Sequence, residues 1–157
     1  MSLARFALRT ATVKAIRGRT FAGPFVRDSE IGPIDELASE GRIPFVVVYT
    51  DDVALKCRGT DLLGNDGRTS LVMEIGVTTR MTPDGDWEIP TTDAGMELTI
   101  DAIERQARTT LTAPAADNPW AELWREIVTD VAEIKSQRGA SAREGVRFAG
   151  RQIVLEV

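Results

Sequence analysis

The chain of 157 residues contains no histidine, and its only cysteine is Cys57. Without histidine there is no His-based nucleophilic triad, no zinc site of the usual kind and no general base of the commonest type. A single cysteine excludes a disulfide within the chain and a cysteine metal cluster. An enzyme built from this sequence would have to use carboxylates, lysine or serine. We therefore expect an intracellular, non-enzymatic protein without a cofactor.

Long hydrophobic runs are also missing. No stretch approaches the roughly 18 uninterrupted apolar residues of a membrane span, so we expect no membrane contact. Apolar residues make up 43% of the chain and charged residues 27%, which is ordinary for a globular protein. The length suits one hydrophobic core, and no linker divides it. We expect a single domain over residues 1–157.

Acidic residues are absent from the first 27 residues, which hold six basic ones. The rest of the chain holds thirteen basic and all twenty-four acidic residues. Such a basic N-terminus can mimic a transit peptide or contact nucleic acid or an acidic partner. We favour a helix face that complements an acidic body, since a pI near 4.9 disfavours a dedicated nucleic-acid binder. The candidate basic partner-binding face comprises Arg5, Arg9, Lys14, Arg17 and Arg19.

The chain is organised around the apolar run Ile43–Asp52. The run is rich in β-branched and aromatic residues, which predicts a strand. Its odd-numbered and even-numbered residues are both apolar, so both faces of this strand should be covered. The run ends in Thr50-Asp51-Asp52, where we expect the chain to leave the core. The polar segment Val53–Thr69 then predicts a protruding hairpin or loop.

Helical spacing of apolar residues predicts three helices. They cover Leu3–Arg17, Asp93–Leu111 with Asp93 as cap, and a segment that begins after the cap Asn118 and whose apolar residues continue to Ile134. In the first helix, Leu3, Phe6, Thr10 and Val13 should share the packed side. In the third, Trp120 and Trp124 should belong to the core.

Alternation of apolar and polar residues predicts further strands. They cover Phe25–Asp28, Ser70–Arg80, Trp87–Ile89 and Val146–Val157, with a helical turn at Pro33–Leu37 and a turn over Gln137–Gly145. The terminal strand changes phase at Gly150, which predicts a β-bulge there. The order of elements predicts an α+β fold: a small mixed, mostly antiparallel sheet flanked by helices, with a long polar hairpin after the central strand.

Carboxylates offer the only candidate chemistry. Asp51, Asp52 and Glu74 could form the metal site of a nuclease or phosphoesterase. The expected Asp-x-Asp and Glu-x-Lys spacings are absent, so a solvated acidic loop is the favoured interpretation. The segment Gly64–Thr69 lacks the Lys-Ser/Thr ending of a phosphate loop, and no helix follows it. We expect no catalytic residue and no metal.

Three patterns, in this order along the chain, resemble tail-terminator and related minor tail proteins of long-tailed phages and phage-like particles. They are the basic helix Leu3–Arg17 leading into Phe25–Asp28, the strand Pro44–Asp52 followed by a polar hairpin and Leu71–Val77, and a helical pair ending in Ile153–Val157. The resemblance covers nearly the whole chain. It implies a mixed sheet flanked by helices, and a hexameric ring that caps the finished tail tube and joins it to the head or neck.

The resemblance also implies the partners. They are copies of the chain itself, the tail tube protein and head or neck connector proteins, in the virion or in the host cytoplasm during assembly. A loop of each subunit would order on assembly or line the ring, and DNA would pass through the lumen without specific binding. The candidate residues of this loop are Asp51, Asp52, Lys56, Arg58, Asp61, Asp66 and Arg68. The alternative is a neck or head–tail joining protein of the same particle.

If the acidic residues of this loop line the lumen of the ring, like charges should repel the DNA, and this can be tested. Replacing Asp51, Asp52, Asp61 and Asp66 by lysine should make the assembled protein retain DNA, because like charges no longer repel the phosphates. Filter binding at low and high salt measures the retention. Unchanged retention would refute the acidic lumen.

Overall fold

The computed structural model describes residues 3–29, 44–56, 66–78, 80–81, 84, 87–89, 92–114, 116–143 and 146–157. Within these residues the helices are α1 (Leu3–Ile16), α3 (Asp93–Thr112) and α4 (Pro119–Ile127), and the strands are β1 (Val26–Asp28), β2 (Phe45–Lys56), β3 (Asp66–Thr78), β4 (Arg80–Met81), β5 (Trp87–Ile89), β6 (Glu133–Arg143) and β7 (Val146–Glu156). The predicted turn at Pro33–Leu37 lies outside the described residues.

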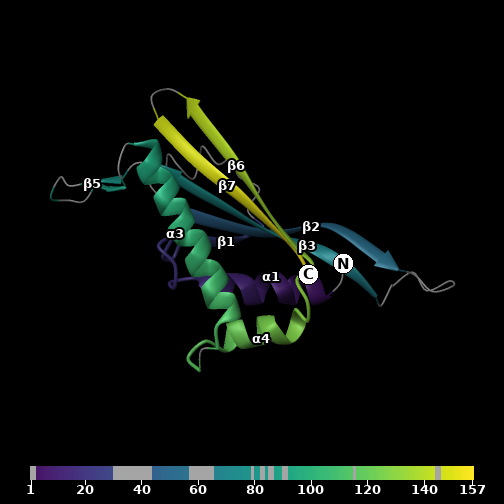
Figure 1. The fold of residues 1–157 in the computed structure, drawn as a ribbon. Helices are drawn as coiled ribbons and strands as arrows, with labels where there is room; N and C mark the ends of the chain where they lie inside the picture. The colour runs from purple at the N-terminus through teal and green to yellow at the C-terminus, as the bar shows by residue number, and fades with distance from the viewer. Residues whose placement is uncertain are drawn as a thin grey trace.

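Five of these strands form one sheet in the order β1-β2-β3-β7-β6, and β4 pairs with β5 apart from it (Figure 1). β1 runs parallel to β2, and the other neighbours are antiparallel. The helices α1, α3 and α4 pack together and cover one face of the sheet. The predicted α+β class, with its mixed and mostly antiparallel sheet, is confirmed.

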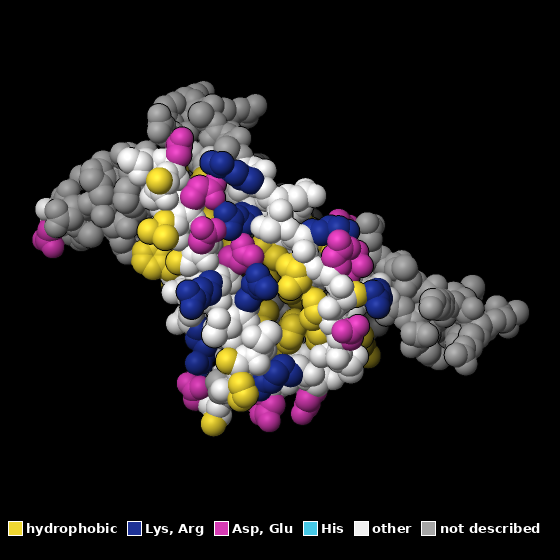
Figure 2. Space-filling view, viewed as in Figure 1, with side chains coloured by type: hydrophobic (Ala, Val, Ile, Leu, Met, Phe, Trp, Pro, Cys, Tyr) yellow, Lys and Arg dark blue, Asp and Glu magenta, His cyan; other side chains and the backbone are white. Residues whose placement is uncertain are grey.

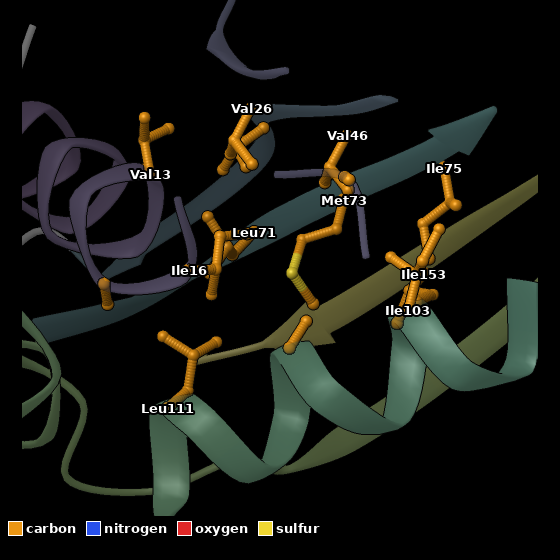
Figure 3. Close-up of a cluster of buried hydrophobic side chains, with 14 of the residues drawn as sticks. Val13, Ile16, Val26, Val46, Leu71, Met73, Ile75, Ile103, Leu111 and Ile153 are labelled. Carbon is orange, nitrogen blue, oxygen red and sulfur yellow. The ribbon is translucent and has the colours of Figure 1, made fainter. Parts of the chain in front are cut away.

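The main core lies between the helices and the sheet (Figure 3). Val13 and Ile16 of α1 and Ile103 and Leu111 of α3 point toward the sheet. The sheet residues that meet them include Val46, Leu71, Met73, Ile75 and Ile153, all fully or almost fully buried. The buried side of α3 agrees with its predicted spacing: Met96, Ile100, Ile103, Ala107 and Leu111.

A second apolar cluster lies on the opposite face of the sheet. Phe45 and Val47 form its buried centre, and Phe25, Tyr49 and Phe148 pack around them. The rings of Phe45 and Phe148 stack with their centroids 6.2 Å apart. The prediction that β2 is apolar and covered on both faces is therefore confirmed for its first half.

β7 passes Gly150 without a bulge, so that prediction is wrong. Gly150 pairs in register with Gly76 of β3 and with Gly139 of β6. The sequence changes phase because the packed face changes: Phe148 contacts the second cluster, whereas Ile153 faces the helices. A regular strand that is buried on one face and then on the other produces the same pattern as a bulge.

β2 does not end at Thr50-Asp51-Asp52, contrary to expectation, but continues to Lys56. Its register against β3 shifts between Asp51 and Val53, so the irregularity in this sheet lies at Asp52. The predicted polar hairpin is confirmed as paired strands that reach Lys56 and Asp66. The last residues of β2 are in a strand because their backbone pairs with β3. Alternation of apolar side chains does not predict such pairing.

The third helix is shorter than predicted. α4 ends at Ile127, Val128 has extended dihedral angles, and the chain enters β6 at Glu133. Val131 and Ile134 are therefore exposed and not helical, and the predicted turn Gln137–Gly145 is mostly strand. Pairing of β6 with the free edge of β7 outweighs the helical spacing of these residues, because propensity is a weak prior against tertiary contacts.

The helix ends and exposed positions bring three smaller corrections. The cap of α3 is Thr92, whose hydroxyl accepts from the Gly95 N–H at 3.1 Å, and not Asp93. Leu3 and Phe6 of α1 are 84% and 54% exposed, because the buried side of α1 is formed by Leu8, Ala11, Thr12, Val13, Ala15 and Ile16. Trp120 is 38% exposed, whereas Trp124 is buried as expected. The cap Asn118 is confirmed, as is the end of α1 before Gly18, whose φ is +74°.

Gly76 yields a stability prediction. A Cβ at Gly76 would lie inside van der Waals contact of the Phe45 ring and 2.9 Å from Phe148 Cζ. Because overpacking a core costs about 1–3 kcal/mol, Gly76→Ala should lower the free energy of unfolding by that amount in denaturant titrations. The matched control is Gly139→Ala, whose Cβ would meet nothing nearer than a carbonyl oxygen at 4.0 Å. Equal effects of the two substitutions would contradict this packing.

Candidate assembly surfaces

A groove of about 570 Å³ opens between α3, the end of α4 and the start of β6. Its apolar lining comprises Leu111, Trp124, Val131, Ile134 and Leu155. Figure 2 shows hydrophobic side chains gathered on this face, bordered by charged ones. Val131 and Ile134 are 36% and 43% exposed there. An apolar surface of this kind inside a charged border is typical of a contact site.

One wall of the groove is fixed by a charge network under α3. Arg151 of β7 donates to Glu97 at 2.7 Å, to Glu104 at 3.0 Å and also to Asp101. Arg138 of β6 forms a second ion pair with Glu97, at 2.6 Å. Acids spaced at i, i+4 and i+7 lie on one side of a helix, so a single half-buried guanidinium can bind all three. This network sets the position of α3 on the β6–β7 hairpin.

The other end of the groove is fixed by Arg125 of α4. Its guanidinium donates to the carbonyl oxygens of Ala113 at 2.9 Å and of Leu111 at 3.4 Å, where α3 ends. It thereby pairs carbonyls that the helix leaves open. The adjacent Trp124 is 4% exposed, and its indole Nε1 has no hydrogen-bond partner among the described residues. A buried indole N–H normally has an acceptor.

Arginines form the outer border of the groove. Arg105 is exposed and forms no ion pair with the described residues, and Arg108 is 3.4 Å from Glu104. Arg105 and Thr109 also line a second groove, of about 540 Å³, on the other side of α3. That groove includes Leu98, which is 71% exposed. Arg105 and Thr109 therefore lie on the side of α3 between two grooves, together with Asp101.

The predicted assembly loop corresponds to the outer part of the β2–β3 hairpin. Asp51 is exposed and pairs with Ser70, and Asp52 lies at the register shift. Lys56 pairs with Asp66 at the last described position, and Arg68 lies 3.9 Å from Asp130. Arg58 and Asp61 lie outside the described residues.

The hairpin leaves the sheet as a two-stranded arm, which we define as Val53–Lys56 with Asp66–Arg68. The outermost backbone hydrogen bonds between β3 and the end of β7 are the pair between Thr69 and Val157. Beyond this point the described pairs join only β2 and β3 (Figure 1). The arm therefore extends past the other strands.

The predicted basic face is engaged largely within the molecule. Arg9 donates to Asp28 at 2.8 Å and to Thr50 at 3.2 Å. Arg17 donates to the Val26 carbonyl at 2.6 Å, and Arg19 donates to Asp117 at 3.0 Å. The structure therefore brings α1, β1 and the start of α4 together through these arginines.

The two remaining basic residues of α1 differ in exposure. Lys14 lies over the Trp120 ring, 5.9 Å from its centroid, and Arg5 is half-buried. Leu3 and Phe6 are the exposed large apolar residues of this helix, and Lys14 is exposed beside them. This side of α1 is a mixed apolar and basic surface.

The carboxylates considered for a metal site are not brought together. Glu74 pairs with Val47, whereas Asp51 pairs with Ser70, four residues further along β2. At about 3.3 Å per residue this separates the two positions by roughly 13 Å, too far to share one ion. Glu74 instead lies near Tyr49, whose hydroxyl accepts from Gln152 at 2.8 Å. Among the described residues no group of three or more acids or cysteines could hold a metal.

The groove was missed at the sequence level because β6 was predicted to be helix and turn. The available signal was the spacing of Glu97, Asp101 and Glu104 on α3, which indicates a shared cation on a neighbouring element. The partner Arg151 belongs to a strand 47 residues beyond Glu104. Only the fold identifies it.

In comparisons with known proteins, no protein-family model and no curated protein matches this chain. Among the described helices, none combines the length and apolar character needed to cross a membrane.

Glu74 yields a pH prediction. Burial raises the pKa of Glu74 above its ordinary value of 4.5, so the ionised form destabilises the fold. This penalty is full at neutral pH and disappears as the pH falls through the raised pKa. Glu74→Gln should therefore raise Tm at pH 7 and leave it unchanged below pH 4.5. The exposed Asp51→Asn is the control, and a lower Tm of Glu74→Gln at pH 7 would contradict the burial argument.

Proposed function

We propose that this protein is a structural assembly protein: a ring-forming subunit like the phage tail terminators, which caps a tail tube and joins it to the head or neck. The proposal rests on the resemblance of the chain from Leu3 to Val157 to that family and on the surfaces described above. In this role the protein performs no chemistry. Its work is to present defined contacts to copies of itself and to the tube.

The observation that supports the proposal most is the placement of two unlike surfaces on one domain. The arm extends from one end of the sheet, whereas the apolar groove lies between α3, α4 and β6. Two unlike surfaces on one subunit allow a heterologous contact, which repeats from subunit to subunit and closes into a ring when the rotation allows.

A second support is the composition of the surface. The exposed apolar residues Leu3 and Phe6 on α1 and Leu98 on α3 lie on the outer sides of helices whose inner sides already form the core. Exposed apolar side chains of this size favour partner contacts. Mixed apolar and basic character on α1 suits a partner surface that is apolar and acidic.

The proposal predicts a closed oligomer. The mass in solution should rise with protein concentration to one fixed value, hexameric by the resemblance, and electron microscopy should show rings. Adding purified tail tubes should place these rings at the tube ends. The measurement is sedimentation velocity over a concentration series, alone and with tubes, followed by negative-stain imaging.

The outcomes separate the candidates. Rings that bind a portal or connector complex but not tubes would instead identify a neck or head–tail joining protein. A monomer at every concentration, with and without tubes, would refute ring formation. Stoichiometric divalent-metal binding in calorimetry would favour the nuclease interpretation.

A further inference from the structure

We propose that the β6 strand of one copy pairs with the β6 strand of a second copy, antiparallel and centred on Ile134. The partner at this edge of the sheet is therefore the same chain. The inference goes beyond the proposed function, because a two-fold pair closes on itself and does not by itself form a ring. It is argued from the free edge of the sheet, from the exposure of β6 and from the order of its charges.

β6 is a long and regular edge strand. It lies at the end of the five-stranded sheet, covers Glu133–Arg143 and pairs with β7 without a register shift (Figure 1). No other strand among the described residues pairs with it. Strands have about 5–6 residues on average, and edge strands are commonly short, bulged or covered, because their unpaired N–H and C=O groups can bind another chain. Within the described part of the chain, β6 is neither short nor bulged nor covered.

The register shows which backbone groups of β6 face outward. Thr69 and Val157 exchange both of their backbone hydrogen bonds, so the odd-numbered residues of β7 bond to β3 and the even-numbered ones bond to β6. In the β6–β7 register these even-numbered residues lie opposite the odd-numbered residues of β6. The N–H and C=O groups of Ile134, Ser136 and Arg138 therefore point to the free edge. A second strand can bind them without disturbing the β6–β7 pairs.

The side chains of β6 leave an apolar residue uncovered at this edge. Every residue from Thr129 to Gly139 is exposed. Ile134 lies next to Leu155 of the core, on the side of the sheet that the helices cover, yet it is 43% exposed. Pairing centred on Ile134 would place the same residue of the partner directly opposite, with the two Cα atoms about 5.5 Å apart. The two isoleucines would then cover each other at the border of the groove.

The charges of this segment are arranged for self-pairing. Glu133 precedes Ile134 and Lys135 follows it, and Asp130 and Arg138 lie four residues to either side. The charges at equal distances from Ile134 are therefore opposite in sign. In an antiparallel pair centred on Ile134, each acid of one copy lies opposite a base of the other. Cross-strand pairs of opposite charge stabilise a sheet, and they select the partner and the register.

Contacts within one copy leave room for this arrangement. Lys135 lies 2.9 Å from Glu133 on the same face of β6, and about half of each side chain is exposed. The partner's Lys135 would give Glu133 a second cation, so that four charges alternate in sign across the two strands. A pair centred on Lys135 would instead place two lysines opposite each other. The order of charges therefore favours the register centred on Ile134.

Exchange of charges across the contact tests the pairing. Lys135→Glu places acids opposite acids in its own dimer, and Glu133→Lys places lysines opposite lysines. Each variant should therefore dimerise about tenfold more weakly than the wild type in sedimentation velocity, and the chain with both substitutions should recover most of the affinity. The control is Glu122→Lys, at an exposed position of α4 outside β6, which should dimerise like the wild type.

Mixing the two single variants tests whether the charges meet between copies. In a mixed dimer of Lys135→Glu with Glu133→Lys, acids lie opposite lysines at both symmetry-related positions, so the mixture should form dimers that neither variant forms well alone. A change confined to each chain would give no recovery on mixing, and that result would overturn the pairing. A double variant that dimerises as weakly as the single ones would also overturn it.

The register is tested with single thiols in a chain that carries Cys57→Ser. A short bismaleimide should link two copies of Ile134→Cys, because this position lies opposite itself in the proposed pair. The matched control is Gln137→Cys, also at an exposed position of β6. Position 137 lies opposite the partner's Val131, so its two thiols are roughly 20 Å apart along the strands and should not be linked. Linkage at Gln137→Cys only, or of Ile134→Cys to tail tube protein only, would overturn the proposal.

The outcomes separate this inference from the proposed function. A dimer that follows the charge exchange but never forms rings would support the β6 pairing and refute the ring. Wild-type rings from both single variants, without linkage at Ile134→Cys, would overturn the pairing and leave the ring standing. A wild-type chain that stays monomeric at every concentration, with and without tubes, would overturn both.

Discussion

The structure depends on β3, which is paired on both edges and buried on both faces. β2 and β7 hydrogen-bond to it in long antiparallel registers, and every side chain from Leu71 to Thr78 except Glu74 is buried. Its odd-numbered residues meet the helices, and Gly76 makes room for Phe45 and Phe148 on the other face. A strand enclosed in this way tolerates little change in volume or register, so the elements around it are placed with respect to it.

The positions of the helices follow from polar contacts at their ends as much as from apolar burial. Arg151 binds three acids of α3, Arg125 binds the carbonyls at its end, and Asn118 joins the start of α4 to the Ala15 carbonyl at 3.1 Å. These contacts are directional, whereas hydrophobic burial is not. They fix α3 and α4 relative to the sheet, and the groove with its exposed Val131 and Ile134 lies beside them.

The same sheet accounts for both surfaces of the proposed assembly. β2 and β3 pair with each other beyond Thr69, and these residues form the arm. β6 pairs with β7, so the chain turns away from α4 after Ile127, and the groove lies beside this connection. A subunit that assembles by repeating one heterologous contact needs two such unlike surfaces. Arg105, which is exposed at the border of the groove, would select the partner more than it strengthens the contact.

Local sequence was sufficient where structure depends on neighbours along the chain. Helical spacing identified the buried side of α3, the Asn-Pro pair identified the start of α4, and alternation identified β3 and β7, because periodicity and caps act over a few residues. Tertiary structure decided the rest: the end of α4 at Ile127, the strand β6, the regular passage of β7 through Gly150, the exposed side of α1 and the groove beside Trp124. Each of these depends on a partner distant in sequence, such as β7 for β6 or Arg151 for α3. The free energy of those contacts outweighs local preferences that amount to a fraction of a kilocalorie per residue.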